Sequence, residues 1–412
     1  MKLHQFLFYL LVIFLPTQLG KHFWPDWSMI NGLRIDYLSP TLYLTDIIII
    51  GILMLWFIEK ITKLRLKISA FDKKEYLLLA AFSFLLIVNC LFAQNQGVAF
   101  YKLVKVIEFS LLGLYIAKTK IQLSTIIRLL SAAVLYSSFL AISQFLNQGS
   151  IGGIFYWLGE RTFDSGTPGI ALAVFNGQLL LRPYATFPHP NVLAGFLVVA
   201  VPLLIVNKPK LWWFISILGI IALFLSFSRV AWITFGLWIM GYIFYGRIIK
   251  YKAWNMIFLF CVIPLLLAIS IIYSPIQQES ITYRQDLNAV ALKMFTSSPL
   301  LGVGLNNFLV RLPEFYRFPG PVYFLQPAHN IFLLIASETG LIGLISLIWF
   351  LILTIRRLLL ITNYMLLTTL STILVLGLFD HYFYTLQQGQ LLLAIILGLS
   401  WSAGRKNVKI TS

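Results

Sequence analysis

The sequence is poor in charged residues, and this shortage excludes a water-soluble protein. Charged residues make up 11% of the 412 positions, whereas 59% are hydrophobic and the mean hydropathy is +0.88. Apolar runs of about 17 to 25 residues, long enough to cross a hydrocarbon core of about 30 Å, recur along the chain. They lack the alternation of barrel strands, so the sequence predicts an all-α, polytopic integral membrane protein.

Several other features are missing. The two cysteines, Cys90 and Cys261, lie within predicted spans, which argues against a structural disulfide. Internal repeats and low-complexity tracts are absent, and no small-x-small cleavage pattern follows the first apolar run, which is therefore expected to stay in the mature chain. No nucleic-acid-binding signature accompanies the net charge of +17. The positive charge is expected to hold loops against anionic membrane lipid, with no nucleic acid as partner.

About twelve spans fit between the charged or Pro/Gly-rich breaks. The polar residues 226–229 interrupt a run too long for one span, so they are interpreted as a tight hairpin between two short helices. The expected spans are residues 3–19, 41–57, 76–92, 99–117, 125–145, 187–206, 212–226, 230–245, 254–273, 331–354, 358–379 and 391–402. Residues 1–412 are thus expected to form a single transmembrane domain.

Lysine and arginine mark alternate loops, and cytoplasmic loops are enriched in them. The basic set lies at residues 60–74, 118–120, 208–210, 247–252 and 356–357 and in the C-terminal tail. These segments are expected to face the cytoplasm. The longer loops, residues 20–40, 147–186 and 274–330, are then expected to be extracytoplasmic, and the last two of them to form the active site.

Rare ionisable groups gather at the expected outer ends of the spans. Such groups are costly at membrane depth, so they are functional candidates. The set comprises Arg182, His189, Arg229, His329, Glu338 and His381.

Proline brackets one of these histidines. Pro188 and Pro190 restrict the backbone around His189, and Asn191 can cap the helix that follows. A rigid start to a helix explains this segment as well as a functional role does, so both readings of His189 stay open.

Two arginines point to an anion. Arg229 breaks the positive-inside pattern, which favours a function over simple snorkelling. Arg284 is expected in the first turn of an amphipathic surface helix, because Leu287, Val290 and Met294 follow at helical spacing. The helix dipole disfavours a cation there, whereas a bound phosphate would satisfy both the guanidinium and the backbone N–H groups. The glycine-punctuated residues 298–308 lack the ending of a P-loop and are expected to be mainly structural.

The remaining candidates begin spans or turns. His329 and Asn330 start a span, where His329 is either a catalytic group or an interfacial cap, and Glu338 lies two to three turns along. His381 belongs to a polar outer hairpin that either closes the site or is a solvated turn. Within the fourth span, Lys102, Lys105 and Glu108 share one helix face and are expected to pair with one another.

In combination, these motifs resemble the O-antigen ligase and polymerase superfamily, which includes protein O-oligosaccharyltransferases. The resemblance covers roughly residues 161–343. It rests on the motif at residues 187–194, on Ser226-x-Ser-Arg229, on Arg284 with the Pro-Leu-Leu-Gly-Val-Gly turn at residues 299–304, and on His329-Asn330 with Gly340 and Gly343.

The resemblance implies a fold similar to the C-type glycosyltransferases, with short surface helices in the outer loops. It implies transfer of a glycan from an undecaprenyl-diphosphate carrier to a hydroxyl of a glycan, lipid or protein acceptor, outside the bacterial cytoplasmic membrane. Arg229 and Arg284 would bind the diphosphate with Arg182. His329 would be the base, supported by His189, Asn191, Asn330, Glu338 and His381.

The chemistry of the residues agrees with this implication. A lipid diphosphate leaves easily, so guanidinium groups can stabilise its charge without a strong acid. A neutral imidazole can take the acceptor's proton, and the rate is expected to fall as the pH drops through about 6.5. The first outer loop has Asp26 and Asp36 but no Asp-x-Asp pair. No metal and no cofactor are therefore expected.

Two other classes compete with an enzyme. A transporter or flippase of lipid-linked glycans would also have about twelve spans, but its polar residues should gather near the bilayer midplane. A non-enzymatic assembly scaffold would not need paired arginines and a histidine on separate outer segments. The sequence leaves ligase, polymerase and protein glycosyltransferase open.

Overall fold

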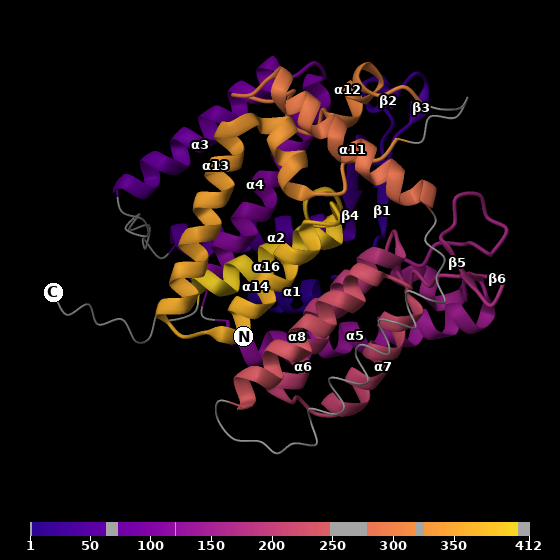
Figure 1. The fold of residues 1–412 in the computed structure, drawn as a ribbon. Helices are drawn as coiled ribbons and strands as arrows, with labels where there is room; N and C mark the ends of the chain where they lie inside the picture. The colour runs from indigo at the N-terminus through magenta and orange to yellow at the C-terminus, as the bar shows by residue number, and fades with distance from the viewer. Residues whose placement is uncertain (1, 63–72, 120, 248–277, 319–324, 403–412) are drawn as a thin grey trace.

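A computed structural model describes residues 2–62, 73–119, 121–247, 278–318 and 325–402, and within them the chain is mostly helical (Figure 1). The helices are α1 (Leu3–Ile13), α2 (Leu44–Thr62), α3 (Lys73–Phe92), α4 (Gln96–Lys118), α5 (Leu123–Asn147), α6 (Pro190–Asn207), α7 (Trp212–Leu225), α8 (Arg229–Arg247), α11 (Gln278–Ser297), α12 (Phe308–Phe315), α13 (Ile331–Leu360), α14 (Tyr364–Gly377), α15 (Tyr382–Thr385) and α16 (Gln387–Ser402). Two short 3₁₀ helices, η1 (Asp26–Ser28) and η2 (Gly153–Leu158), lie in the expected outer loops. The chain is a helical membrane protein, as the sequence predicted.

Three of these helices, α5, α6 and α13, are long and apolar enough to cross a membrane within the described part of the chain. Shorter apolar helices occur at α1, α7, α14 and the second half of α3. The span expected at residues 254–273 lies outside the described residues.

Some expected boundaries are displaced for local reasons. The first helix ends at Ile13, because Pro16 follows and Gly20 begins a strand. The turn after α13 falls at residues 361–363, where Asn363 accepts a hydrogen bond from the backbone N–H of Leu366 and caps α14. The expected span at residues 358–379 therefore begins later, at Tyr364.

Three antiparallel strand pairs, which the sequence did not predict, shape the expected outer loops. Strand β1 (Gly20–His22) pairs with β4 (Thr41–Tyr43), and β2 (Met29–Ile30) pairs with β3 (Leu33–Arg34). Strands β5 (Leu172–Phe175) and β6 (Gln178–Leu181) turn at Asn176 and Gly177, which both have positive φ. The expected surface helix is α11, with Leu287, Val290 and Met294 buried on one face.

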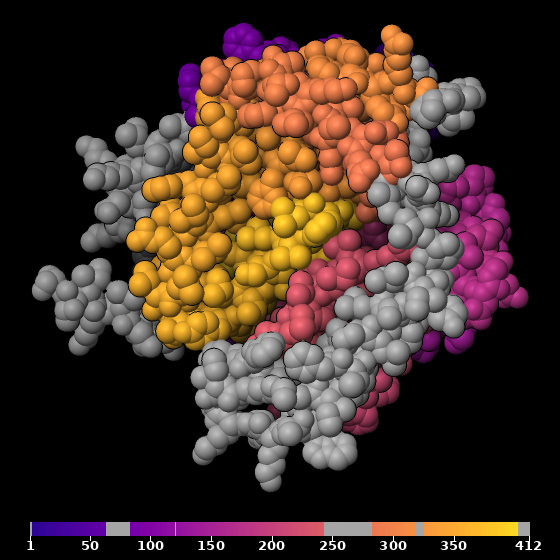
Figure 2. All heavy atoms as spheres, viewed as in Figure 1, coloured from indigo at the N-terminus to yellow at the C-terminus, as the bar shows by residue number. Residues whose placement is uncertain are grey.

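Helix α6 lies at the centre of the largest hydrophobic cluster. It packs against α5, α7, α8, α14 and α16, and most of its apolar residues are buried. In Figure 2 the C-terminal α15–α16 segment is visible between the part of the surface formed by α11–α13 and the part formed by α8. The first turn of α6 is thereby placed among the loops that carry the candidate residues.

Helix α13 is broken at Gly340, whose φ of 65° and ψ of −165° are not helical. The backbone groups released by this break pair with residues 299–304. The N–H of Val303 donates to the carbonyl of Ser337 at 2.8 Å, and the N–H of Leu341 donates to that of Pro299 at 2.7 Å. The glycine-punctuated turn is thus a structural clamp on α13.

Replacing Gly340 with alanine should destabilise the fold. A side chain in this backbone conformation costs about 1–3 kcal/mol, and the added Cβ would also overlap the backbone of Leu300. The melting temperature of the detergent-purified protein should fall clearly for Gly340→Ala. Gly241→Ala is the control, because Gly241 lies in α8 with open space around its Cβ position and should melt at or above the wild-type temperature. Equal melting temperatures of the two variants would contradict this interpretation.

Candidate functional site

Side chains from five segments far apart in the sequence meet at one end of the helices. They come from the β6–α6 connection, the α7–α8 hairpin, helix α11, the start of α13 and the α14–α15 turn. The set comprises Arg182, His189, Asn191, Arg229, Arg284, His329, Asn330, Asp380 and His381.

Arg182 joins the β6–α6 connection to the α7–α8 hairpin. Its Nε donates to the carbonyl of Ser226 at 2.8 Å, and its Nη2 donates to Oδ1 of Asn191 at 2.6 Å. Burial lowers the pKa of Arg182 to about 10, and the nearby charges of Arg284 and Arg229 also lower it. Arg284 and Arg229, the other two arginines expected from the sequence, are therefore both close enough to repel Arg182. The bonds of Arg182 show that it also has a structural role.

Arg284 lies half-buried on α11. The helix begins at Gln278, so Arg284 lies in its second turn, and the expectation that it occupies the first turn is wrong. Among the described residues its side chain has no hydrogen bond or ion pair, yet its charge lowers the pKa values of His329 and His381. Its guanidinium donors are therefore available to a ligand.

Two histidines and an aspartate form the centre of the site. The ring centroids of His329 and His381 are 5.1 Å apart. Nδ1 of His381 is 2.7 Å from the hydroxyl of Thr385, and Oδ2 of Asp380 accepts a hydrogen bond from Nδ2 of Asn191 at 3.1 Å. Nδ1 of His329 is buried and has no hydrogen-bond partner among the described residues. Among the described residues of this group, it is the one buried side-chain nitrogen or oxygen without a hydrogen bond, and burying such an atom costs free energy.

Burial decides the charge of these histidines. It lowers the pKa of His329 to about 3, against the opposing charge of Asp380, and it lowers the pKa of His381 to about 4. Burial alone would raise the pKa of Asp380, but His381, His329 and Arg284 lower it to about 2. At neutral pH the site therefore holds neutral imidazoles beside an ionised carboxylate.

The other expected residues make structural contacts. His189 and Asn330 cap helices, and Glu338 makes a hydrogen bond elsewhere. Nδ1 of His189 accepts the backbone N–H of Asn191 at 3.1 Å, so His189 caps α6 and the expectation that Asn191 caps it is wrong. Asn330 caps α13 by accepting the N–H groups of Phe332 and Leu333. Glu338 is buried and accepts a hydrogen bond from the hydroxyl of Tyr384 at 2.7 Å, deeper along α13.

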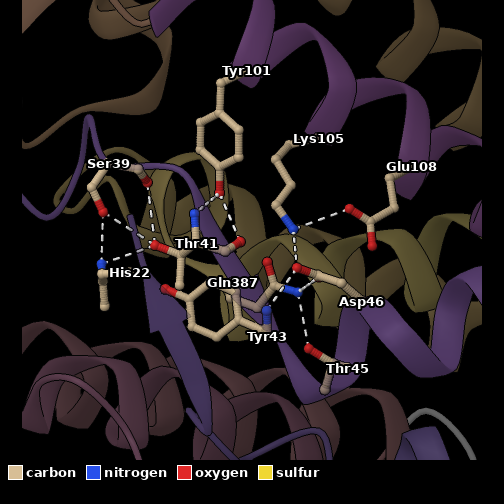
Figure 3. A network of polar contacts seen from close by, with 10 residues as sticks. All are labelled: His22, Ser39, Thr41, Tyr43, Thr45, Asp46, Tyr101, Lys105, Glu108 and Gln387. Carbon is tan, nitrogen blue, oxygen red and sulfur yellow. Dashed lines mark hydrogen bonds and ion pairs between the residues drawn. The ribbon is translucent and has the colours of Figure 1, made fainter. Parts of the chain in front are cut away.

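A buried polar network supports the segment that follows His381 (Figure 3). Nζ of Lys105 lies 2.6 Å from Asp46 and 3.0 Å from Glu108, and Nε2 of Gln387 donates to Asp46 and Thr45. The expected pairing of Lys105 with Glu108 is therefore present.

Lys102 does not join that group. Its Nζ donates to the carbonyl of Tyr384 and to Oε1 of Gln390, and it lies 4.2 Å from the centroid of the Tyr384 ring. Among these contacts the expected pairing of Lys102 with Glu108 is not seen. Groups of Tyr384 and Gln390 take the place of the glutamate. Lys102 and Lys105 together fix the segment behind Asp380 and His381.

Sequence reasoning missed two residues of the site. Asp380 was seen as part of a polar hairpin, and its position next to a candidate histidine was the available signal. Tyr37, in the first outer loop, has its ring 5.5 Å from that of His381, and no local pattern marks it.

The charge of the site suits an anion. One ligand atom from each of His329, Asp380 and His381 could be offered to a metal ion, since these atoms lie within 4.8 Å of one another. A cation there would meet the charges of Arg284 and Arg182, which already lower pKa values in the cluster. Guanidinium groups instead match phosphate oxygens in geometry and charge.

Comparison with known proteins adds one match. Residues 214–348 match the model of a family described as O-antigen ligase. The matched range includes Arg229, Arg284, His329 and Glu338, whereas Arg182, His189 and Asn191 precede it and His381 follows it. A search of curated proteins found no match.

The geometry predicts that the site binds inorganic diphosphate and that Arg284 contributes to the binding. Arg284→Lys keeps the charge but loses the planar fork, so the Kd should rise about 10-fold if one charge-assisted bond of roughly 1.5–3 kcal/mol is lost. Titration calorimetry of the purified protein measures the change.

The matched control is Arg311→Lys. Arg311 lies on α12, and its guanidinium pairs with Glu314 at 2.7 Å, outside the arginine cluster. Unchanged diphosphate affinity in Arg284→Lys, or an equal loss in Arg311→Lys, would remove Arg284 from the binding site.

Proposed function

We propose that this chain, which the match at residues 214–348 assigns to the O-antigen ligase and polymerase superfamily, transfers a glycan from an undecaprenyl-diphosphate carrier to an acceptor hydroxyl. The family match supports glycan transfer of the O-antigen ligase type and a glycosyltransferase-like enzyme that works with a lipid-linked glycan and an acceptor. The carrier, the side of the membrane and the residue roles are parts of the proposal.

The observation that carries the proposal is the position of Arg284 beside the neutral His329, together with Arg182, on which the charges of Arg284 and Arg229 both act. The charges of Arg284 and Arg229 lower the pKa of Arg182, and a bound anion would offset this repulsion. A diphosphate supplies two or more negative charges, and His329 presents a buried nitrogen without a partner among the described residues. This transfer needs groups that neutralise the charge of the diphosphate and a base that takes the acceptor's proton.

The reaction can be followed atom by atom. With its proton on Nε2, His329 accepts the acceptor's hydroxyl proton at Nδ1 while the acceptor oxygen attacks the anomeric carbon of the sugar. The bond between that carbon and the phosphate oxygen breaks, and its electron pair leaves with the diphosphate. Arg284 and Arg229 stabilise the charge that develops on the phosphate oxygens. Asp380 stabilises the imidazolium that forms.

A bound donor also changes the base. In the empty site burial keeps the pKa of His329 low, which makes the neutral imidazole a weak base. The negative charge of a diphosphate beside it raises that pKa, because it favours the protonated form. The donor thus increases the basicity of His329 at the moment when a proton must be taken.

The proposal includes a membrane arrangement. Residues 1–412 form one transmembrane domain with about twelve spans, related in fold to the C-type glycosyltransferases, in the bacterial cytoplasmic membrane. The loops at residues 147–186 and 274–330 face outside. Support comes from the basic residues of alternate loops and from the meeting of all the expected outer segments at one end of the helices.

His329→Ala should reduce glycan transfer by about 10²–10⁴-fold, since this is the usual contribution of a general base. Diphosphate affinity should stay close to the wild-type value, because the arginines bind the diphosphate. A transfer assay with lipid-linked donor measures the first quantity and calorimetry the second. His22→Gln removes another outer-loop histidine, one that contacts Ser39 and Thr41, and should keep its activity. A folded His329→Ala enzyme with near wild-type transfer would refute the role.

The pH profile should differ from that of an exposed histidine. The lowered pKa of His329 keeps the base neutral below pH 6.5, so the acid limb of kcat/KM should lie well below 6.5, in contrast to the expectation from the sequence. The acid limb of kcat should lie at higher pH, because the bound donor raises the pKa. Coincident limbs at pH 6.5 would contradict this charge arrangement.

Transfer should not depend on a metal ion. Arginines neutralise the leaving diphosphate in this mechanism, and the outer loops lack an Asp-x-Asp pair. Purified enzyme is therefore expected to keep its rate in excess EDTA. Loss of activity that magnesium or manganese restores would overturn the mechanism.

A further inference from the structure

Exposed apolar side chains are concentrated in a short turn of the second expected outer loop. This aromatic turn, the 3₁₀ helix η2 (Gly153–Leu158), has Ile154 and Trp157 each 72% exposed and Tyr156 55% exposed. The chain has no charged residue between Arg128 and Glu160. Apolar groups gathered in this way mark a surface that something apolar covers.

The aromatic turn is held rigidly. The carboxylate of Glu160 is buried and accepts the N–H groups of Ile151 and Gly152, each at 2.8 Å. Gly159 has a φ of 103°, and a Cβ on it would lie 2.6 Å from Oγ1 of Thr17. The turn is thus fixed against the segment that follows α1, where Nε2 of Gln18 also donates to the carbonyl of Gly159.

The aromatic turn continues the exposed apolar surface of α5. The ring of Phe155 packs against that of Phe139, with centroids 6.5 Å apart. Phe139 is 55% exposed on α5, and Leu146 in the last turn of α5 is 77% exposed. Since α5 is long and apolar enough to span a membrane, its exposed apolar side chains face lipid, and the turn extends that lipid-facing surface beyond the helix end.

We propose that the aromatic turn inserts into the interface of the lipid bilayer, with Tyr156 and Trp157 at the level of the headgroups. Tyrosine and tryptophan favour this region, because one part of each ring system is apolar and another forms hydrogen bonds with water or headgroups. The partner is a zwitterionic lipid surface, because the turn has no charged group with which to select anionic lipid.

The aromatic turn is coupled to the functional site through Gln144. Its Nε2 donates to Glu160 at 2.8 Å, and its Oε1 accepts the N–H groups of Tyr184 and Ala185. Nη2 of Arg161 also donates to the carbonyl of Pro188, next to His189. The turn therefore sets the depth at which the arginines meet a membrane-bound diphosphate. This second step rests on the proposed function, whereas lipid contact does not.

Spin labels test the lipid contact. Trp157→Cys and Ser165→Cys, both at exposed positions of the same loop, are labelled with nitroxide in the full chain in phosphatidylcholine vesicles. The wild-type chain with its native cysteines, treated identically, gives the background. The ratio of collisions with oxygen to collisions with a water-soluble nickel chelate should be at least about threefold higher at position 157 than at 165. Equal ratios would overturn the proposal.

An activity measurement tests the depth setting. Trp157→Asp should slow transfer from a long-chain polyprenyl donor in vesicles by about fivefold or more, since a carboxylate is disfavoured in the interface. Transfer from a short-chain, detergent-soluble donor should be unchanged. Ser165→Asp adds the same charge to the loop and should keep both rates. An equal loss of transfer rate with both donors, or no loss with either, would refute the proposal that the turn sets the depth of the site. Lipid contact would then be judged from the spin-label ratios alone.

Discussion

A side-chain amide placed between a guanidinium and a carboxylate joins the two halves of the site. Asn191 accepts from Nη2 of Arg182 through Oδ1 and donates to Oδ2 of Asp380 through Nδ2. Arginine can only donate and an ionised carboxylate can only accept, so the amide has one orientation that satisfies both. Because Asn191 lies in the first turn of the buried helix α6, this bridge ties the α14–α15 turn and the β6–α6 connection to the core.

A bound anion would offset the repulsion that Arg182 meets from Arg284 and Arg229. The charges of Arg182 and Arg284 both act on Asp380, and the two central histidines are neutral because burial lowers their pKa values. Repulsion among the arginines is the cost of keeping guanidinium groups in place before the donor arrives. Packing supplies the compensation, since the same end of the molecule is closed by the clamp on α13 and by the buried contacts of Lys102 and Lys105.

The sequence predicted the helical membrane class because apolar runs and their polar breaks are local signals. It also selected most residues of the cluster, since ionisable groups near the ends of apolar runs are rare. It could not predict that Lys102 binds Tyr384 and Gln390, because those partners are about 280 residues away. The start of α11 was misplaced for a different reason. Ser280 and Thr282 both suit a helix cap, but the helix begins at Gln278.

Part of the site lies within residues 214–348, which match the family model, and part lies outside, and the two parts have different physical roles. Arg229, Arg284 and His329 lie within residues 214–348, whereas Asn191, Asp380 and His381 lie outside. The matched part holds the groups proposed to bind the diphosphate and to take the proton. The surrounding part supplies the amide bridge, the carboxylate and the second imidazole, which fix the orientation and charge of the first set. A matched segment alone therefore cannot define the electrostatics of the base, because Asp380 and His381 both act on the pKa of His329.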